Sequence, residues 1–221
     1  WRPDACDRLP PRIREFSPLT CMTTCRNPDC LTFDLCMQFA TTGCPLTLRR
    51  TAKLEHEELC KFQPYSCPCP GTPCRWQGSL DAVVPHLKQQ HKSITTLQGK
   101  DILFTAAGVD LPGTINWVMV QSCFGFHFLL VLEKRERPRE HQQFFALVLL
   151  IGTRKQAKKF VYRLELSKSS RLLAWEASPR SILEGVASVI TNTDCLVFDK
   201  ATARLFAENG NLDINVSICY T

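Results

Sequence analysis

Cysteine and histidine residues recur at matching intervals in two adjacent stretches of the chain. In each stretch eleven residues separate a cysteine from a histidine, so the pattern is an internal repeat and carries more weight than a single motif. Thiolate sulfurs and imidazole nitrogens in this order are ligands of tetrahedral zinc, with one pair on a turn and the other on a helix. The repeat members are Cys67, Cys74, His86 and His91 in the later stretch, and Cys44, His56 and Cys60 in the earlier one.

The later stretch offers four donors, which predicts a closed structural site rather than a catalytic site with an open coordination position. Its two cysteines flank a turn rich in proline and glycine, and a predicted helix follows. His86 and His91 are five positions apart, so the helix must distort or end between them. Cys69 is an alternative to Cys67. We favour Cys67 because it stands seven positions before Cys74, the offset that we expect in the earlier stretch.

The earlier stretch has no fourth donor at the matching offset. Met37 stands seven positions before Cys44, and Cys36 is one position further away. A thioether is a poor zinc ligand beside thiolates. Two alternatives therefore remain: a one-residue bulge brings Cys36 to the metal, or the site has three protein ligands. We predict one or two structural zinc ions (Zn2+) per chain.

The distribution of cysteines favours metal binding over disulfides. Thirteen cysteines are present, which is an odd number, and ten of them precede residue 75. Together with histidines at ligand spacing, this composition indicates a zinc protein of a reducing compartment. Cys123, Cys195 and Cys219 lie in apolar, strand-like contexts, where a free cysteine is usually a small buried hydrophobe. His127 and His141 lack companions at ligand spacing and are predicted not to bind metal.

The charge balance permits contact with nucleic acid but does not demand it. The formal net charge is +6, and the predicted helix at 79–91 offers only Lys88, Gln89 and Gln90 for contacts with bases. Nucleic-acid binding is therefore the weaker interpretation. The longest apolar run, residues 142–152, is shorter than the roughly 18 residues that a membrane span requires. We expect no membrane-spanning segment.

From about residue 93 the sequence is typical of a β-sheet domain. Apolar and polar residues alternate clearly in 160–166, which predicts a strand with one buried face. The loop between that strand and the next reads as a hairpin. Predicted strands occupy residues 94–98, 101–107, 115–122, 127–134, 143–152, 159–167, 171–177, 195–199 and 211–220. Many short strands with few helices predict a mainly β (α+β) fold, an antiparallel β-sandwich.

The pattern divides the chain into three regions. Residues 1–35 are rich in proline, have few periodic apolar residues and are predicted to be irregular. Residues 36–92 hold the two zinc units, and 93–221 form the sandwich. Short helices are also predicted within the sandwich, at 181–192 and at 200–210, the second closed by Gly210 as its C-cap.

Many stretches resemble the Seven in absentia (Siah/Sina) family of RING-type E3 ubiquitin ligases. They run from about Met37 to the end of the chain. Among them are HEELC (56–60), YSCPCPG (65–71), WQGSLDAV (76–83), QSCFGFHF (121–128) and LFAENGNL (205–212). The resemblance implies an amino-terminal RING, two Siah-type zinc fingers and a carboxy-terminal TRAF-like sandwich that binds substrates and forms homodimers.

The amino-terminal part departs from the RING of that family. Residues 19–28 resemble the last part of a RING, with Met22 where a second adjacent cysteine is expected. Two tetrahedral sites need eight ligands, and no histidine precedes His56. The cysteines ahead of the fingers are Cys6, Cys21, Cys25, Cys30 and Cys36. We therefore expect a degenerate or missing RING, and a ubiquitin-conjugating enzyme as a partner only if a RING is supplied.

The resemblance also implies a groove in which a degron peptide of Pro-x-Ala-x-Val-x-Pro type adds to a sheet edge as a strand. The corresponding positions are Thr95, Leu97, Ile115, Asn116, Trp117, Met119 and Asn215. Trp117 is the expected anchor, because aromatic side chains dominate small binding hot spots. Asn116 stands where family members carry an acidic residue, so we do not expect a charge-dependent part of the family's selectivity to carry over. The alternative is that Trp117 and Met119 are core residues of an alternating strand; the resemblance favours the groove.

Three functions are compatible with these features. The favoured one is a zinc-stabilised module that binds substrate proteins for ubiquitin-dependent proteasomal degradation, in cytoplasm and nucleus. It would be a homodimer, or a heterodimer with an intact relative. The second is an active ligase whose RING is absent from this sequence, and the third is a zinc-finger protein that binds nucleic acid. No side chain is assigned a catalytic role, because such ligases act by positioning the conjugating enzyme.

Overall fold

The computed structural model describes residues 35–36, 39, 42–48, 56–57, 60–71, 73–136 and 142–221. All but the last residue of the predicted irregular segment 1–35 lies outside these ranges, as do Met37 and His141. Within them, no helix combines the length and the apolar character that crossing a membrane requires.

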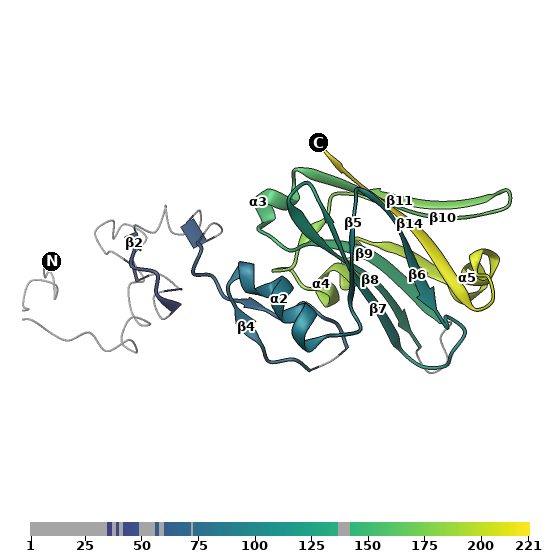
Figure 1. Cartoon of the computed structure of the whole chain (residues 1–221), viewed down its shortest axis with the longest axis horizontal. Helices are drawn as coiled ribbons and strands as arrows, with labels where there is room; N and C mark the ends of the chain where they lie inside the picture. The colour runs from purple at the N-terminus through teal and green to yellow at the C-terminus, as the bar shows by residue number, and fades with distance from the viewer. Residues whose placement is uncertain are drawn as a thin grey trace, which may run out of the picture.

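Two β-sheets pack face to face to form a sandwich (Figure 1). The four-stranded sheet has the order β11–β10–β14–β6, and the six-stranded sheet has the order β12–β9–β8–β7–β5, with β13 also paired to β9. The strands of the first sheet are β6 (Asp101–Ala107), β10 (Phe160–Lys168), β11 (Arg171–Ala177) and β14 (Asn211–Tyr220). The strands of the second are β5 (Thr95–Gln98), β7 (Ile115–Cys123), β8 (Phe126–Arg135), β9 (Gln143–Leu150), β12 (Arg180–Ser181) and β13 (Leu196–Asp199).

The mainly β sandwich predicted from the sequence is confirmed. Most neighbouring strands are antiparallel, but two short pairs, β5 with β7 and β12 with β9, run parallel. Alternate residues of the longer strands fill the space between the sheets, as the pleat of a β-strand requires. In β10 the predicted alternation holds: the residues from Phe160 to Leu166 are buried at every second position.

The six-stranded sheet is covered on its outer face as well. Helices α2 (Leu80–Gln90) and α4 (Val186–Thr191) contribute to a second buried cluster, which includes Val83 and Leu87 of α2 and Leu129 of β8. Because both faces of this sheet are buried, β8 and β9 consist of nearly continuous apolar residues rather than an alternating pattern. This explains the long apolar run in residues 142–152.

Shorter elements complete the fold. Two-residue strands form the pairs β1 (Leu35–Cys36) with β2 (Thr47–Leu48), and β3 (Tyr65–Ser66) with β4 (Gln77–Gly78). Helix α3 (Arg154–Ala157) begins with a capping box in which Thr153 and Gln156 bond to each other's backbone. Helix α5 (Lys200–Phe206) begins at Asp199, whose carboxylate accepts from the N–H of Thr202.

Three local expectations differ from the structure. The helix predicted at 181–192 is confined to α4, because the residues before it form β12 and a turn. Gly210 is not a C-cap: α5 ends at Phe206, and Gly210 has a φ of +76° in the turn where the backbones of Glu208 and Asn211 bond to each other. Cys219 is exposed rather than buried, because it follows the inward-facing Ile218 on β14.

A lysine is buried at one end of the sandwich core. Lys134 of β8 is 0% exposed, and its ammonium group donates to the carbonyl oxygens of Val109, at 3.3 Å, and Leu111. Burial lowers the pKa of Lys134. The side chain thereby links the β6–β7 loop to β8. Among the described residues, its hydrogen-bond partners are these carbonyl oxygens and not a carboxylate.

We predict that Lys134→Met lowers the free energy of unfolding by about 1–3 kcal/mol, because it removes the donor from the buried carbonyl oxygen of Val109 and from the partly buried one of Leu111. Urea unfolding followed by tryptophan fluorescence measures the change. Lys100→Met removes the same group from a largely exposed position and is expected to alter stability by less than about 0.5 kcal/mol. Equal stability of the two variants would contradict the role assigned to Lys134.

Candidate functional site

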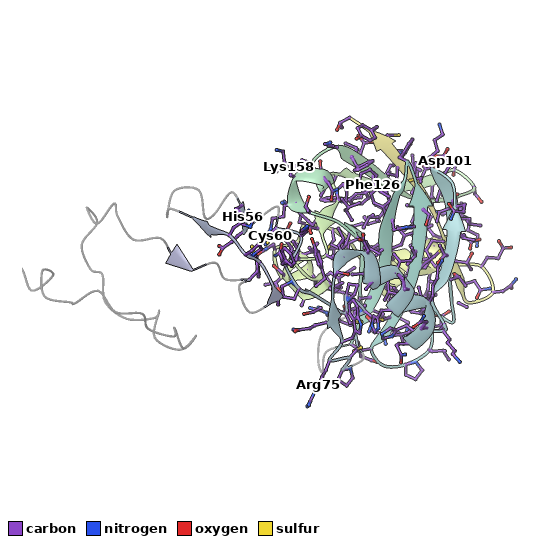
Figure 2. The ribbon with its side chains drawn as sticks, turned by 60° about the vertical axis from the view of Figure 1, so that its left-hand side comes forward. His56, Cys60, Arg75, Asp101, Phe126 and Lys158 are labelled. Carbon is purple, nitrogen blue, oxygen red and sulfur yellow. The ribbon has the colours of Figure 1, made fainter. Side chains whose placement is uncertain are left out.

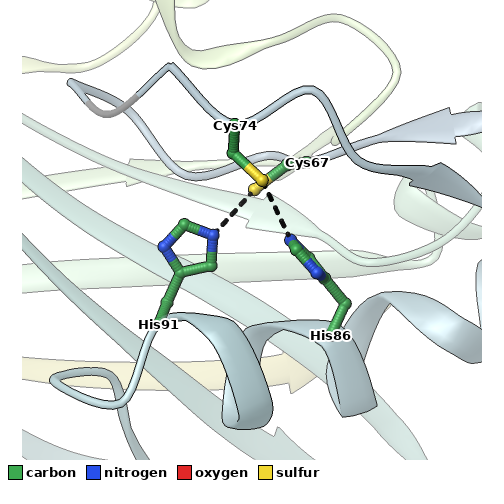
Figure 3. Close-up of side chains that lie close together, drawn as sticks. All are labelled: Cys67, Cys74, His86 and His91. Atoms are coloured by element: carbon green, nitrogen blue, oxygen red, sulfur yellow. Dashed lines mark hydrogen bonds between the residues drawn. The ribbon is translucent and has the colours of Figure 1, made fainter.

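Four donor side chains meet between the β3–β4 hairpin and helix α2 (Figure 3). Their ligand atoms, on Cys67, Cys74, His86 and His91, all lie within 4.8 Å of one another. The Cys67 Sγ lies 3.2 Å from His91 Nε2, and the Cys74 Sγ lies 3.6 Å from His86 Nε2. A tetrahedral ion with Zn–S of about 2.3 Å and Zn–N of about 2.0 Å places such atoms about 3.5 Å apart. The donor set and its dimensions therefore fit one closed, structural zinc ion.

The end of helix α2 explains how two histidines five positions apart reach the same point. His86 lies inside the helix, whereas His91 is its C-cap, with a φ of −118° and a ψ of 64°. The N–H of His91 donates to the carbonyl of Leu87 at 2.9 Å, which closes the last turn. The helix thus ends between the two ligands, as their spacing predicted.

An aromatic side chain holds one of the histidines in place. The rings of Trp76 and His86 are stacked, with centroids 4.2 Å apart and an angle of 7° between the planes. Trp76 was not singled out from the sequence. The available signal was an aromatic residue two positions after the second cysteine, where the β-hairpin returns toward the helix.

Burial sets the protonation states at this site. It raises the pKa of the Cys67 thiol to about 11 and lowers the pKa of His86, to which the neighbouring His91 also contributes. At neutral pH, without an ion, His86 is therefore neutral and Cys67 carries its proton. Zinc binding must release that proton, so zinc affinity is expected to fall as the pH falls.

The earlier cluster contains three donors among the described side chains. The ligand atoms of Cys44, His56 and Cys60 lie within 4.8 Å of one another, and Figure 2 shows His56 and Cys60 side by side. The Cys44 Sγ lies 3.5 Å from His56 Nε2, and burial raises the pKa of Cys60. The backbone of Cys36 pairs with Thr47 in β1 and β2, but its side chain lies outside the described part of the chain. Cys36 therefore stays a predicted fourth ligand.

Two other side chains considered from the sequence lie outside these clusters. Cys69, the alternative to Cys67, is half-buried and is not a member of the four-donor group. The Nδ1 of His127 lies 2.7 Å from the Oγ of Ser122 on the neighbouring strand. His127 is thus engaged in a cross-strand pair on the sheet face.

A cavity of about 540 Å³ lies next to the later cluster, between the finger and the edges of the two sheets. Five of the seven predicted peptide-binding residues line it: Thr95, Ile115, Asn116, Trp117 and Met119. The other two do not. Leu97 is exposed on β5, and Asn215 is exposed on β14 between the buried Ile214 and Val216, on the outer face of the four-stranded sheet.

Trp117 and Met119 belong to the cavity and to the core at once. Both are partly buried and pack against the sandwich interior, and both line the cavity. The indole N–H of Trp117 donates to the carbonyl of Ala107 at 2.9 Å, which joins β7 to the end of β6. The two alternatives weighed for these residues are therefore compatible with each other.

Comparisons with known proteins agree with this architecture. Residues 30–104 match the family model "Sina, zinc finger", and residues 121–217 match "Sina, TRAF-like domain". The chain is 66% identical over 181 residues to the human E3 ubiquitin-protein ligase SIAH2, an alignment that covers 82% of this chain and 56% of SIAH2. It is 57% identical over 213 residues to the Drosophila melanogaster E3 ubiquitin-protein ligase sina, covering 91% of this chain and 68% of sina.

The chain belongs to the Sina family of E3 ubiquitin ligases. It spans little more than half the length of the human and Xenopus laevis SIAH2 proteins, 56% and 58%. Membership of the Sina family confirms the resemblance seen in the sequence. The Sina zinc-finger match and the two Cys/His clusters together fit structural zinc binding.

Proposed function

We propose that this chain is the substrate-recognition module of a Sina-type E3 ubiquitin ligase and that it captures an extended segment of its target in the cavity beside β7. The observation that carries the proposal is the cavity itself, which gathers five of the positions expected for a peptide groove. A cavity at the junction of two sheet edges suits an extended peptide, since backbone bonds give affinity and alternate side chains give selectivity.

The side chains around the cavity suggest how a peptide is held. Trp117 presents an aromatic surface whose position is fixed by its bond to Ala107, which makes it the anchor. The Oδ1 of Asn116 is buried and has no hydrogen-bond partner among the described residues. We expect it to accept from a peptide N–H once a bound peptide displaces the groups that cover it, and as a neutral group it does not select for a basic residue.

The finger and the sandwich would present the target while a RING binds the ubiquitin-conjugating enzyme. We propose that the RING comes from the same protein or from an intact relative in a heterodimer, and that the module also forms homodimers. The outcome would be ubiquitin-dependent degradation of the target in the cytoplasm and nucleus.

The test is the affinity for a fluorescein-labelled peptide of the Pro-x-Ala-x-Val-x-Pro pattern. We predict that Trp117→Ala weakens binding by about thirtyfold, since a hot-spot residue contributes 2 kcal/mol or more. Fluorescence anisotropy measures the dissociation constant, and thermal melting confirms that the variant is folded.

Trp175→Ala serves as the matched control. Trp175 packs against the sandwich core from β11 and does not line the cavity, so its removal lowers stability without altering the groove. Unchanged peptide affinity in folded Trp117→Ala, or an equal loss in Trp175→Ala, would overturn the proposed function.

A further inference from the structure

The loop between the two cysteines of the later finger forms part of the peptide cavity. Residues 69–71 of this loop line the cavity of about 540 Å³, and so does His91, one of the four donors. The same three loop residues line a second cavity of about 570 Å³, together with Glu133 and Arg135 of β8. The loop is therefore a wall that the two cavities share.

One contact joins this wall to the floor of the peptide cavity. Gly71 has a φ of +80°, and a Cβ atom added there would lie 2.3 Å from the Nδ2 of Asn116. Glycine is thus required at this position both by the backbone conformation and by the close approach of the Asn116 side chain. Asn116 is the residue whose Oδ1 lacks a partner, so the loop sets where this polar group sits in the cavity.

The zinc site holds the two ends of the same loop. Cys67 and Cys74 lie on either side of residues 68–73, and the backbone bond from the Cys67 N–H to the Trp76 carbonyl, at 3.1 Å, anchors only its base. With both sulfurs bound to one ion, the loop is closed and its conformational freedom is reduced. Without the ion, the wall and the position of His91 lose this constraint.

We infer that zinc bound at Cys67, Cys74, His86 and His91 positions residues 69–71 as a wall of the peptide cavity, so that zinc occupancy and peptide binding are thermodynamically linked through the Gly71–Asn116 contact. This inference rests on the proposed function. Linkage is reciprocal: the factor by which zinc strengthens peptide binding is the factor by which peptide strengthens zinc binding.

The first experiment uses the full chain with and without zinc. Removal of zinc by a chelator is expected to weaken binding of the fluorescein-labelled peptide by at least about fivefold. Saturating peptide is expected to raise zinc affinity by the same factor, measured by competition with a chromophoric chelator. Near-UV circular dichroism monitors whether the sandwich stays folded. Equal peptide affinity in the two forms overturns the linkage alone, whereas no binding by the zinc-loaded chain overturns the proposed function and the linkage with it.

The second experiment keeps zinc bound and alters the contact. Gly71→Ala is expected to displace the Asn116 carboxamide and weaken peptide binding by about fivefold, with one zinc ion still present at the later site. Gly125→Ala is the matched control, because Gly125 has a similar φ of +75° and nothing within 4 Å of the added Cβ. The control is expected to bind peptide as the unmodified chain does.

A double-mutant cycle separates the contact from general strain. In Gly71→Ala/Asn116→Ala the added methyl group no longer meets an amide, so the double variant is expected to bind more tightly than the two single losses together predict. Additive losses, or a Gly71→Ala variant that binds peptide as well as Gly125→Ala does, would overturn the inference.

Discussion

Replacing Cys74 with serine is expected to remove one zinc ion per chain and to destabilise the sandwich together with the finger. The change leaves three donors at a site whose geometry requires four. Zinc binding energy in a small finger is also folding energy, with apparent values of about 10–16 kcal/mol in isolated finger peptides. We expect the free energy of unfolding to fall by at least about 3 kcal/mol, because helix α2 then loses its metal link to the β3–β4 hairpin and is left with the packing around Trp76. Native mass spectrometry gives the zinc count, and calorimetry gives the stability.

The control for this prediction is the same chemical change at a neighbouring cysteine. Cys69 lies in the same loop but outside the four-donor group, so Cys69→Ser is expected to keep the zinc count unchanged. Cys69→Ser also tests the choice between Cys67 and Cys69 that the sequence left open, because only the true ligand is needed to hold the ion. If Cys69→Ser lost the ion and Cys74→Ser retained it, the proposed ligand set would be wrong.

The sequence was most informative where a short-range rule determines the structure. The strands predicted at 101–107, 171–177 and 211–220 coincide with β6, β11 and β14, because alternation reports directly which face of a strand is buried. The spacing of His86 and His91 likewise predicted that a helix ends between them, since a helix repeats every 3.6 residues. The four donors could be grouped because ligand spacing in a finger is a local property.

Features that depend on distant parts of the chain were not predictable in this way. The docking of α2 on the outer face of the six-stranded sheet joins residues 80–90 to β7 and β8, and no local pattern encodes that contact. The burial of Lys134 depends on carbonyl groups of a loop more than twenty residues away. The position of Asn215 was inferred from resemblance, and its strand turns the side chain to the opposite face of the sheet from the core. In each case the local sequence allowed more than one environment for the side chain, and tertiary packing decided between them.

The shared core between finger and sandwich leads to a prediction of comparable size. Leu87→Ala is expected to lower the free energy of unfolding by about 2–5 kcal/mol, the usual cost of a large cavity in a closely packed core. Leu87 is 1% exposed and lies in the cluster formed with Val120 and Leu129 of the sheet. All four zinc donors remain, so the zinc count should not change. Leu172→Ala makes the same substitution at a leucine that is 61% exposed and should cost less than about 0.5 kcal/mol.

The manner of unfolding distinguishes a shared core from two separate units. If α2 and the sheet stabilise each other, Leu87→Ala lowers the midpoint of a single calorimetric transition, because neither part keeps its full stability alone. An independent finger would instead give two transitions, with that of the sandwich unmoved. A single shifted transition would also support the zinc-dependent wall of the peptide cavity. The helix that carries His86 would then be held by the ion on one side and by β7 and β8 on the other.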